Sequence, residues 1–153
     1  MKAVVQRIID ASVTVNGHNK GSVESGLLVY LGVAQGDSKK DADWLADKIV
    51  NLRIFNDEGG VMNLSLKDVI AGKEERTGIL VISQFTLLAD ARKGRRPSWS
   101  GAAQPEAAKE LYEYFIIKIR EQGILCEHGE FQANMKVTAT NDGPVTILLD
   151  TKF

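Results

Sequence analysis

Apolar and polar residues alternate at the start of the chain, which predicts a long β-strand over residues 2–15. The apolar residues that share one parity, and so are expected to point inward, are Ala3, Val5, Ile9, Ala11, Val13 and Val15. The turn-rich segment NGHNKGSVESG follows and predicts a hairpin connection. A continuous apolar run comes later, GLLVYLGV at 26–33, and the largely apolar segment GILVISQFTLLA at 78–89 predicts a second buried strand. Runs of this length are typical of strands buried on both faces.

Two segments instead have their apolar residues at helical spacing. The first is capped by Asp37 or Ser38 and carries its periodic positions at Trp44, Leu45, Lys48, Ile49 and Leu52. The second opens with Pro105 in its first turn and can close at Gly123. Its apolar stripe consists of Ala108, Leu111, Tyr112, Phe115, Ile116 and Ile119.

The remaining segments are shorter or less regular. RIFNDEGG at 53–60 predicts a short strand and a turn, MNLSLKDVIAG at 62–72 fits either element type, and 90–105 is a long polar loop. Further strands are expected at about 124–127, 131–140 and 144–150. Two helices are too few for an alternating βαβ array, so we predict an α+β fold. We expect a mainly antiparallel curved sheet or open β-barrel, with both substantial helices packed on one face.

Composition limits the class of protein. The chain has 153 residues, 44% hydrophobic and 25% charged, which suits one domain over residues 1–153. Its net charge of −1 gives no global attraction to nucleic acid, so such contacts need a local patch. A single cysteine allows no disulfide within the chain. No signal peptide or membrane-spanning run is evident, and we expect a cytoplasmic protein that does not contact a membrane.

Conventional catalytic signatures are missing. His18 lies in a turn-rich segment, and His128 with Cys126 has no metal-ligand spacing. Neither a G-x-S-x-G motif nor a phosphate-binding Walker loop occurs. An enzyme with this sequence is therefore expected to use no metal, no cofactor and no catalytic triad.

Three stretches remain as candidates for function. In SQFTL, Ser83, Gln84 and Thr86 place polar groups where a buried strand emerges, although they also suit an ordinary strand end. The four cations of ARKGRRPSW suit RNA phosphates, or form a solvated loop: Arg92, Lys93, Arg95 and Arg96. In TNDGPVTILLD a proline stands at the head of an alternating strand. That corner is either turn chemistry or a backbone shaped to meet a ligand.

These stretches together resemble the D-aminoacyl-tRNA deacylase family. The similarity is carried by SQFTLLAD, KGRRPSW…AAQP and NDGPVTILLD, with MKAVVQRI, GLLVYLGV and FNDEGGVMNLSL in support. Two departures are visible. Arg95 and Trp99 stand where the family usually has Asn and Phe, and Gln132 replaces a glycine between Phe131 and Met135.

The resemblance implies hydrolysis of the ester that joins a D-amino acid to tRNA, by a homodimer whose RNA partner is the aminoacylated 3′ end. It implies that a cis Gly143-Pro144 corner, held by Arg7, enters the partner's pocket and rejects L-aminoacyl-tRNA. Glycyl-tRNA mischarged on tRNA(Ala) is then also cleaved. It assigns substrate binding to Gly143, Pro144, Arg7, Ala102, Phe131 and Met135, and tRNA binding to Arg92, Lys93, Arg95 and Arg96.

The catalytic residues under this resemblance are Ser83, Gln84, Phe85, Thr86 and Thr146. The ester is already activated and the ribose 2′-hydroxyl can assist, so the backbone N–H groups of Ser83–Phe85 would serve mainly as oxyanion donors. A threonine nucleophile would need an adjacent base, and no motif supplies one. Two alternatives stay open at this point: a non-catalytic tRNA-binding or synthetase-associated editing module, and a structural homodimer that uses the corner only as a latch.

Overall fold

A computed structural model describes residues 1–71 and 76–152. Its strands are β1 (Lys2–Val15), β2 (His18–Val23), β3 (Ser25–Gly32), β4 (Phe55–Asn56), β5 (Met62–Leu64), β6 (Thr77–Ser83), β7 (Leu125–His128) and β8 (Lys136–Asp150). Its helices are α1 (Lys39–Val50), α2 (Leu66–Ile70), the 3₁₀ helix η1 (Phe85–Leu88) and α3 (Pro105–Arg120). The segment 62–72, which fitted either element type, contains β5 and α2, and its last residue lies outside the described residues.

The main sheet is mixed, which corrects part of the prediction. β1 pairs antiparallel with β2, β3 and β8, as expected for a mainly antiparallel sheet. However, β3 pairs parallel with β6, and β6 pairs parallel with β7. The chain crosses from β3 to β6 through α1, and from β6 to β7 through α3. The few helices therefore do form βαβ crossovers, because each returns the chain to the same end of the sheet.

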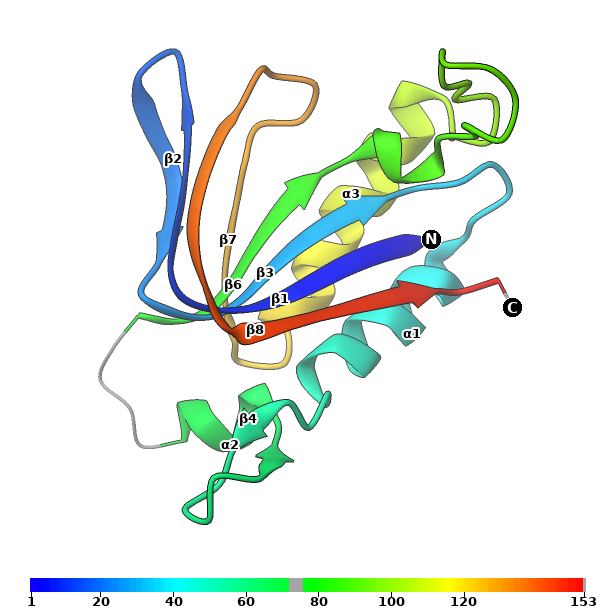
Figure 1. Cartoon of the computed structure of the whole chain (residues 1–153). Helices are drawn as coiled ribbons and strands as arrows, with labels where there is room; N and C mark the ends of the chain where they lie inside the picture. Colours follow the sequence, from blue (N-terminus) through cyan, green and yellow to red (C-terminus); the bar gives the residue numbers. More distant parts are fainter. Residues whose placement is uncertain (72–75, 153) are drawn as a thin grey trace.

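The sheet curls into a half-barrel, and β8 lies along β1 for almost its whole length (Figure 1). Both long strands bend near their middle, where the β1–β8 register shifts on either side of Ile8. Arg7 and Ile8 are consequently both buried, while Ile9 is 57% exposed. The prediction that Ile9 points inward was wrong, because simple alternation does not anticipate a β-bulge.

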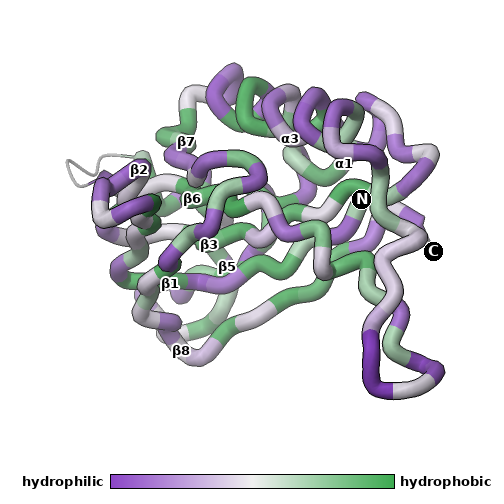
Figure 2. The backbone as a smooth tube through the Cα atoms, turned by 90° about the horizontal axis from the view of Figure 1, so that it is seen from above, coloured by the Kyte–Doolittle hydropathy of each residue, from purple (hydrophilic) through white to green (hydrophobic). Residues whose placement is uncertain are grey.

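α1 and α3 cover one face of the sheet, as predicted (Figure 2). The larger core lies between these helices and the sheet. It joins sheet residues such as Val29 and Ile79 to helix residues such as Leu45 and Phe115. A second cluster, with Leu28 and Leu80, fills the inside of the curl. β3 and β6 are thus buried on both faces, as their unbroken apolar runs indicated.

The helix ends follow their predicted signals. Ser38 is the N-cap of α1, and Asp41 accepts hydrogen bonds from the Ser38 N–H and hydroxyl, both at 2.8 Å. Pro105 opens α3, and Gly123 follows its end with a φ of +75°. The strand predicted over 131–140 begins only at Lys136, because residues 131–133 form a turn. That turn contributes to the candidate active site.

Candidate active site

A cavity of about 550 Å³ opens where β6 ends, beside the start of α3. We call it the inner cavity. It brings together six of the predicted site residues from three separate segments: Ser83, Gln84, Phe85, Ala102, Phe131 and Met135. Gln132, noted above as a departure from the family glycine, also lines it. The remaining walls are small or apolar residues that were not predicted to belong to the site: Ile82, Ala103, Pro105, Ala108, Ala133 and Val137.

The floor of the inner cavity depends on a close approach between η1 and the end of β3. The Gln84 N–H donates to the Leu31 carbonyl at 2.8 Å, and the chain then turns into η1. A Cβ at Gly32 would lie 2.6 Å from Leu88 Cδ2 and 2.9 Å from the Gln84 carbonyl oxygen. Only glycine at this position lets η1 seat against β3 in this way.

The turn into η1 also decides which backbone donors remain available. Since the Gln84 N–H is bound to Leu31, it is not available to a ligand. The N–H groups of Phe85 and Thr86, by contrast, make no hydrogen bond within the part of the chain that the structure describes. The first N–H groups of a helix have no partner inside it. The free donors therefore lie one residue further along than the predicted stretch Ser83–Phe85.

Among the described residues, neither candidate threonine has a base as its hydrogen-bond partner. The Thr86 hydroxyl accepts a hydrogen bond from the Gln84 side-chain amide. The Thr146 hydroxyl lies on β8, outside the inner cavity, and accepts from Gln6 Nε2 at 3.2 Å. Both partners are amide donors that cannot take a proton, so neither hydroxyl is activated as a nucleophile.

The wall opposite η1 is the turn that replaces the start of the predicted strand. Phe131 packs its ring 5.7 Å from that of Tyr112, whose hydroxyl donates to the Val81 carbonyl at 2.9 Å. Burial raises the pKa of Tyr112, so its hydroxyl remains a donor. Gln132 adopts a φ of +63°, a conformation that glycine takes more easily. This residue replaces a family glycine yet keeps the backbone shape that glycine would favour.

Gly143 and Pro144 are exposed at the bend of β8 and do not line the inner cavity of their own chain. The bond between them is cis. Gly143 has a φ of +126°, and a Cβ there would lie 2.8 Å from Val145 Cγ2 and 3.1 Å from Arg7 Nη2. We call residues 142–145 the corner.

The Arg7 side chain binds the corner through Asp142. Its Nε donates to the Asp142 carbonyl at 3.2 Å and lies 3.1 Å from the Asp142 carboxylate. Its Nη1 donates to the Ile54 carbonyl at 2.6 Å and to Asn56 Oδ1 at 3.3 Å. Arg7 is only 7% exposed, and its planar fork meets these acceptors from two segments at once.

Asn141 is a second support that the sequence analysis missed. Its side-chain Nδ2 donates to the Arg7 carbonyl at 2.9 Å and to the Val145 carbonyl at 3.4 Å. Arg7 has no register partner in β8, because the β1–β8 register shifts between Gln6 and Ile8. The side chain thus bridges the two strands where their ladder is interrupted. Its place in NDGP signalled only ordinary turn chemistry.

The basic loop, Arg92 to Arg96, is fully on the surface beyond η1. Arg92 folds back on Asp90, with Nε 2.9 Å from Oδ1 and Nη2 2.6 Å from Oδ2. Hydrogen bonds from the Arg92 side chain lower the pKa of the Asp90 carboxyl. Lys93, Arg95 and Arg96 form no ion pair among the described residues, so their charges face solvent.

Other chemistry is limited near the site. Burial raises the pKa of the Cys126 thiol to about 12, so it is protonated at neutral pH and unreactive. Within residues 1–71 and 76–152, no three His, Cys, Asp or Glu side chains cluster as a metal site would require. None of the described helices is long and apolar enough to cross a membrane.

A sequence model of the D-Tyr-tRNA(Tyr) deacylase family matches residues 4–150. The chain belongs to this family. It is therefore a hydrolase that acts on ester bonds, and aminoacylated tRNA is its substrate class.

Relatives of this deacylase match nearly end to end. A D-aminoacyl-tRNA deacylase of Koribacter versatilis is 57% identical over 152 residues, covering 99% of this chain and 98% of the relative. One of Thermosipho melanesiensis is 56% identical over 153 residues, with the same coverage. A solved structure named c-Myc DNA Unwinding Element Binding Protein is 39% identical, has a TM-score of 0.89 and covers 99% of both chains. A probable eukaryotic D-amino acid tRNA deacylase has a TM-score of 0.77 at 15% identity and supports the fold alone.

Proposed function

We propose that this deacylase hydrolyses D-aminoacyl-tRNA in the inner cavity of one chain while the corner of a second chain closes that cavity. The observation that carries this proposal is the separation of the two parts. Ser83 to Phe85 and Phe131 line the inner cavity, whereas Gly143 and Pro144 stand exposed on a different part of the same chain. A homodimer would bring one part to the other.

The edge of β8 supports a homodimer. Among the described residues no strand pairs with the side of β8 that faces away from β1. Leu148 on that strand is 76% exposed. An unpaired edge strand that exposes apolar side chains readily pairs with another chain. Residues 144–150 are therefore proposed to lie near the interface.

The carbonyls of Gly143 and Pro144 would then exclude L substrates. A rigid pair of carbonyls placed where an L side chain must project rejects every L-aminoacyl ester without recognising any side chain. A D side chain points elsewhere, and glycine has none, so glycyl-tRNA mischarged on tRNA(Ala) should also be cleaved. The hydrogen bonds of Arg7 and Asn141 would keep the corner rigid, as the exclusion of L substrates requires.

Hydrolysis itself is proposed to need little from side chains. The N–H groups of Phe85 and Thr86 are the donors left for the developing oxyanion. The ribose 2′-hydroxyl beside the ester would position or deprotonate the water. The amide partners of Thr86 and Thr146 argue against either threonine as nucleophile. Ser83 and Gln84 would contribute by shaping the floor, and Ala102, Phe131 and Met135 by enclosing the terminal adenosine.

We infer that residues 1–153 act as one domain in the cytoplasm.

Mixing two inactive variants tests whether the corner acts across the dimer. Ala102→Trp should fill the inner cavity, and Gly143→Val should distort the corner, since even a Cβ there lies 2.8 Å from Val145. Each variant alone is expected to be inactive toward D-tyrosyl-tRNA. Co-expressed chains form heterodimers that contain one intact cavity facing one intact corner, so part of the activity should return.

The controls are thermal melting of each variant and mass spectrometry of the intact dimers, which distinguishes heterodimers from homodimers by mass. Heterodimers that are as inactive as both parents would mean that the corner does not complete a partner's cavity. A monomer at micromolar concentration would exclude the shared site altogether.

Neutralising the basic loop should weaken tRNA binding in a salt-dependent way. The Lys93→Ala, Arg95→Ala, Arg96→Ala triple variant should lower the slope of log K against log salt by about three units if each cation contacts one phosphate. Arg92→Ala should change the slope less, because Asp90 already neutralises that side chain. Filter binding across a salt series measures the slope, and an unchanged slope would mean that the loop is only solvated.

A further inference from the structure

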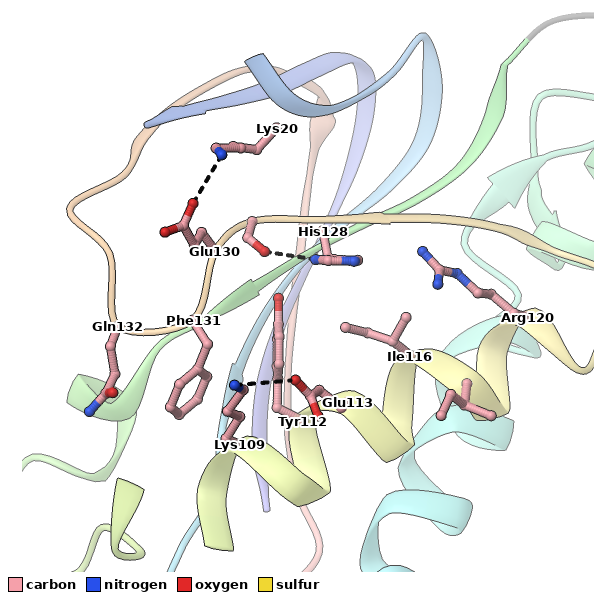
Figure 3. A pocket seen from close by; sticks show the side chains of 12 residues that line it. Lys20, Lys109, Tyr112, Glu113, Ile116, Arg120, His128, Glu130, Phe131 and Gln132 are labelled. Carbon is pink, nitrogen blue, oxygen red and sulfur yellow. Dashed lines mark hydrogen bonds and ion pairs between the residues drawn. The ribbon is translucent and has the colours of Figure 1, made fainter. Parts of the chain in front are cut away.

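A second cavity, of about 720 Å³, lies on the far side of the Phe131-Gln132 wall (Figure 3). We call it the outer cavity. Phe131 and Gln132 line both cavities, so only this thin wall separates them. The two cavities are therefore neighbours, lying on opposite sides of the same two residues.

The base of the outer cavity is an apolar surface on α3. Tyr112 is fixed there by its hydrogen bond to Val81, and its ring meets that of Phe131. Ile117 also lines the cavity and is 49% exposed, so its apolar side chain is open to a ligand there. Apolar and aromatic surfaces of this kind accept the face of a nucleobase without regard to its sequence.

The rim carries three cations from two elements, with Lys20 on β2 and with Lys109 and Arg120 on α3. Lys20 Nζ lies 3.1 Å from Glu130, and Lys109 Nζ lies 3.8 Å from Glu113. The side chains of both pairs are more than 40% exposed, so these ion pairs are weak and a phosphate can replace the carboxylate.

Arg120 adds a positive charge with a fixed direction. Its Nε and Nη2 both donate to the Cys126 carbonyl, at 3.1 Å and 2.7 Å. Among the described residues no carboxylate forms an ion pair with it. The guanidinium is thus held by a neutral group and keeps its full charge for a ligand.

His128 contributes a directed acceptor. Its Nδ1 lies 2.7 Å from the Gly129 carbonyl, which can only accept, so Nδ1 carries the proton of the neutral ring. Nε2 is then an acceptor, and the ring extends into the cavity toward Arg120 (Figure 3). Such an acceptor suits a ribose 2′-hydroxyl or the amino group of a base.

We propose that the outer cavity binds the RNA strand that directly precedes the terminal adenosine. One base lies on the Ile117 surface, and its flanking phosphates lie against Lys20, Lys109 and Arg120. This assignment rests on the proposed function, since it takes the inner cavity as the site of the aminoacylated end. The outer cavity then senses whether the ester is attached to an RNA chain.

Two substrates of different length test the assignment. D-tyrosyl-tRNA reaches both cavities, whereas the D-tyrosyl ester of adenosine fills only the inner one. The Lys20→Glu, Lys109→Glu double variant should raise KM for the tRNA substrate about tenfold, the loss expected for one or two charge-assisted contacts. Its kcat and its kcat/KM for the adenosine ester should equal those of the wild type.

The matched control is Lys40→Glu, Lys48→Glu, which makes the same change of charge on exposed α1 positions that do not line the cavity. Ile117→Asp is a second test, because it removes the apolar surface without altering a lysine. Equal changes with both substrates, or no change with either, would overturn the assignment.

Failure of the proposed function has a different signature. If the wild type hydrolyses neither ester, the proposed hydrolysis of D-aminoacyl-tRNA is wrong. Filter binding of uncharged tRNA then still tests the outer cavity. The cavity double variant must then bind more weakly than the α1 control, and equal binding would overturn the assignment.

Discussion

Arg7→Ala should lower kcat/KM for D-tyrosyl-tRNA about 100-fold, the cost of moving a positioned group by roughly 1 Å. Arg7 is the only described side chain that ties the Asp142 carbonyl of the corner to the Ile54 carbonyl before β4. Alanine leaves both acceptors without their donor in a site where Arg7 itself is 7% exposed. We also expect the free energy of unfolding to fall by about 1–3 kcal/mol for the unpaired groups. Steady-state hydrolysis and urea unfolding measure the two effects.

Arg7→Lys is the matched control, because it keeps the charge and loses the planar fork. An ammonium cannot reach Asp142 and Ile54 with the same geometry, so its activity should lie between those of the wild type and alanine. The position of the corner would be unimportant for hydrolysis if the alanine variant, folded and dimeric, retained wild-type kcat/KM.

Phe115→Ala should lower the free energy of unfolding by about 3–5 kcal/mol, the range for emptying a large buried aromatic site. Phe115 is fully buried in the core between α3 and the sheet. Typical domains have a total stability of about 5–15 kcal/mol, so this loss is a large fraction of it. α3 also carries Tyr112, which supports the wall between the cavities, and activity should fall as the helix loosens.

Ile117→Ala on the same helix is the control for Phe115. Its side chain is 49% exposed, and surface substitutions usually stay within about 0.5 kcal/mol. Equal urea midpoints for the two variants would mean that the core between α3 and the sheet contributes little to stability.

Local signals in the sequence were sufficient for most single elements. Ser38 and Pro105 marked the starts of both long helices, and the apolar runs marked β3 and β6 as strands buried on two faces. These succeed because capping and burial act over a few neighbouring residues. The likeness to a deacylase family also selected six of the thirteen residues that line the inner cavity.

Features that depend on distant parts of the chain were not predictable. The parallel pairing of β3, β6 and β7 depends on how α1 and α3 return the chain, which no local pattern encodes. Ile9 is exposed because β8 shifts its register against β1. Likewise, the Gln84 N–H is occupied by a hydrogen bond to the Leu31 carbonyl on the neighbouring strand. Asn141 donates to the Arg7 carbonyl, a residue far away in the sequence, where the β1–β8 pairing is interrupted.

The most direct test is hydrolysis of D-tyrosyl-tRNA, L-tyrosyl-tRNA and glycyl-tRNA(Ala) by the wild-type protein under one set of conditions. We expect release of D-tyrosine and glycine, with L-tyrosyl-tRNA decaying no faster than in buffer. Binding of all three without hydrolysis would instead indicate a non-catalytic tRNA-binding module. Cleavage of L-tyrosyl-tRNA as fast as the D form would contradict the account, because the corner held by Arg7 and Asn141 would then not distinguish chirality.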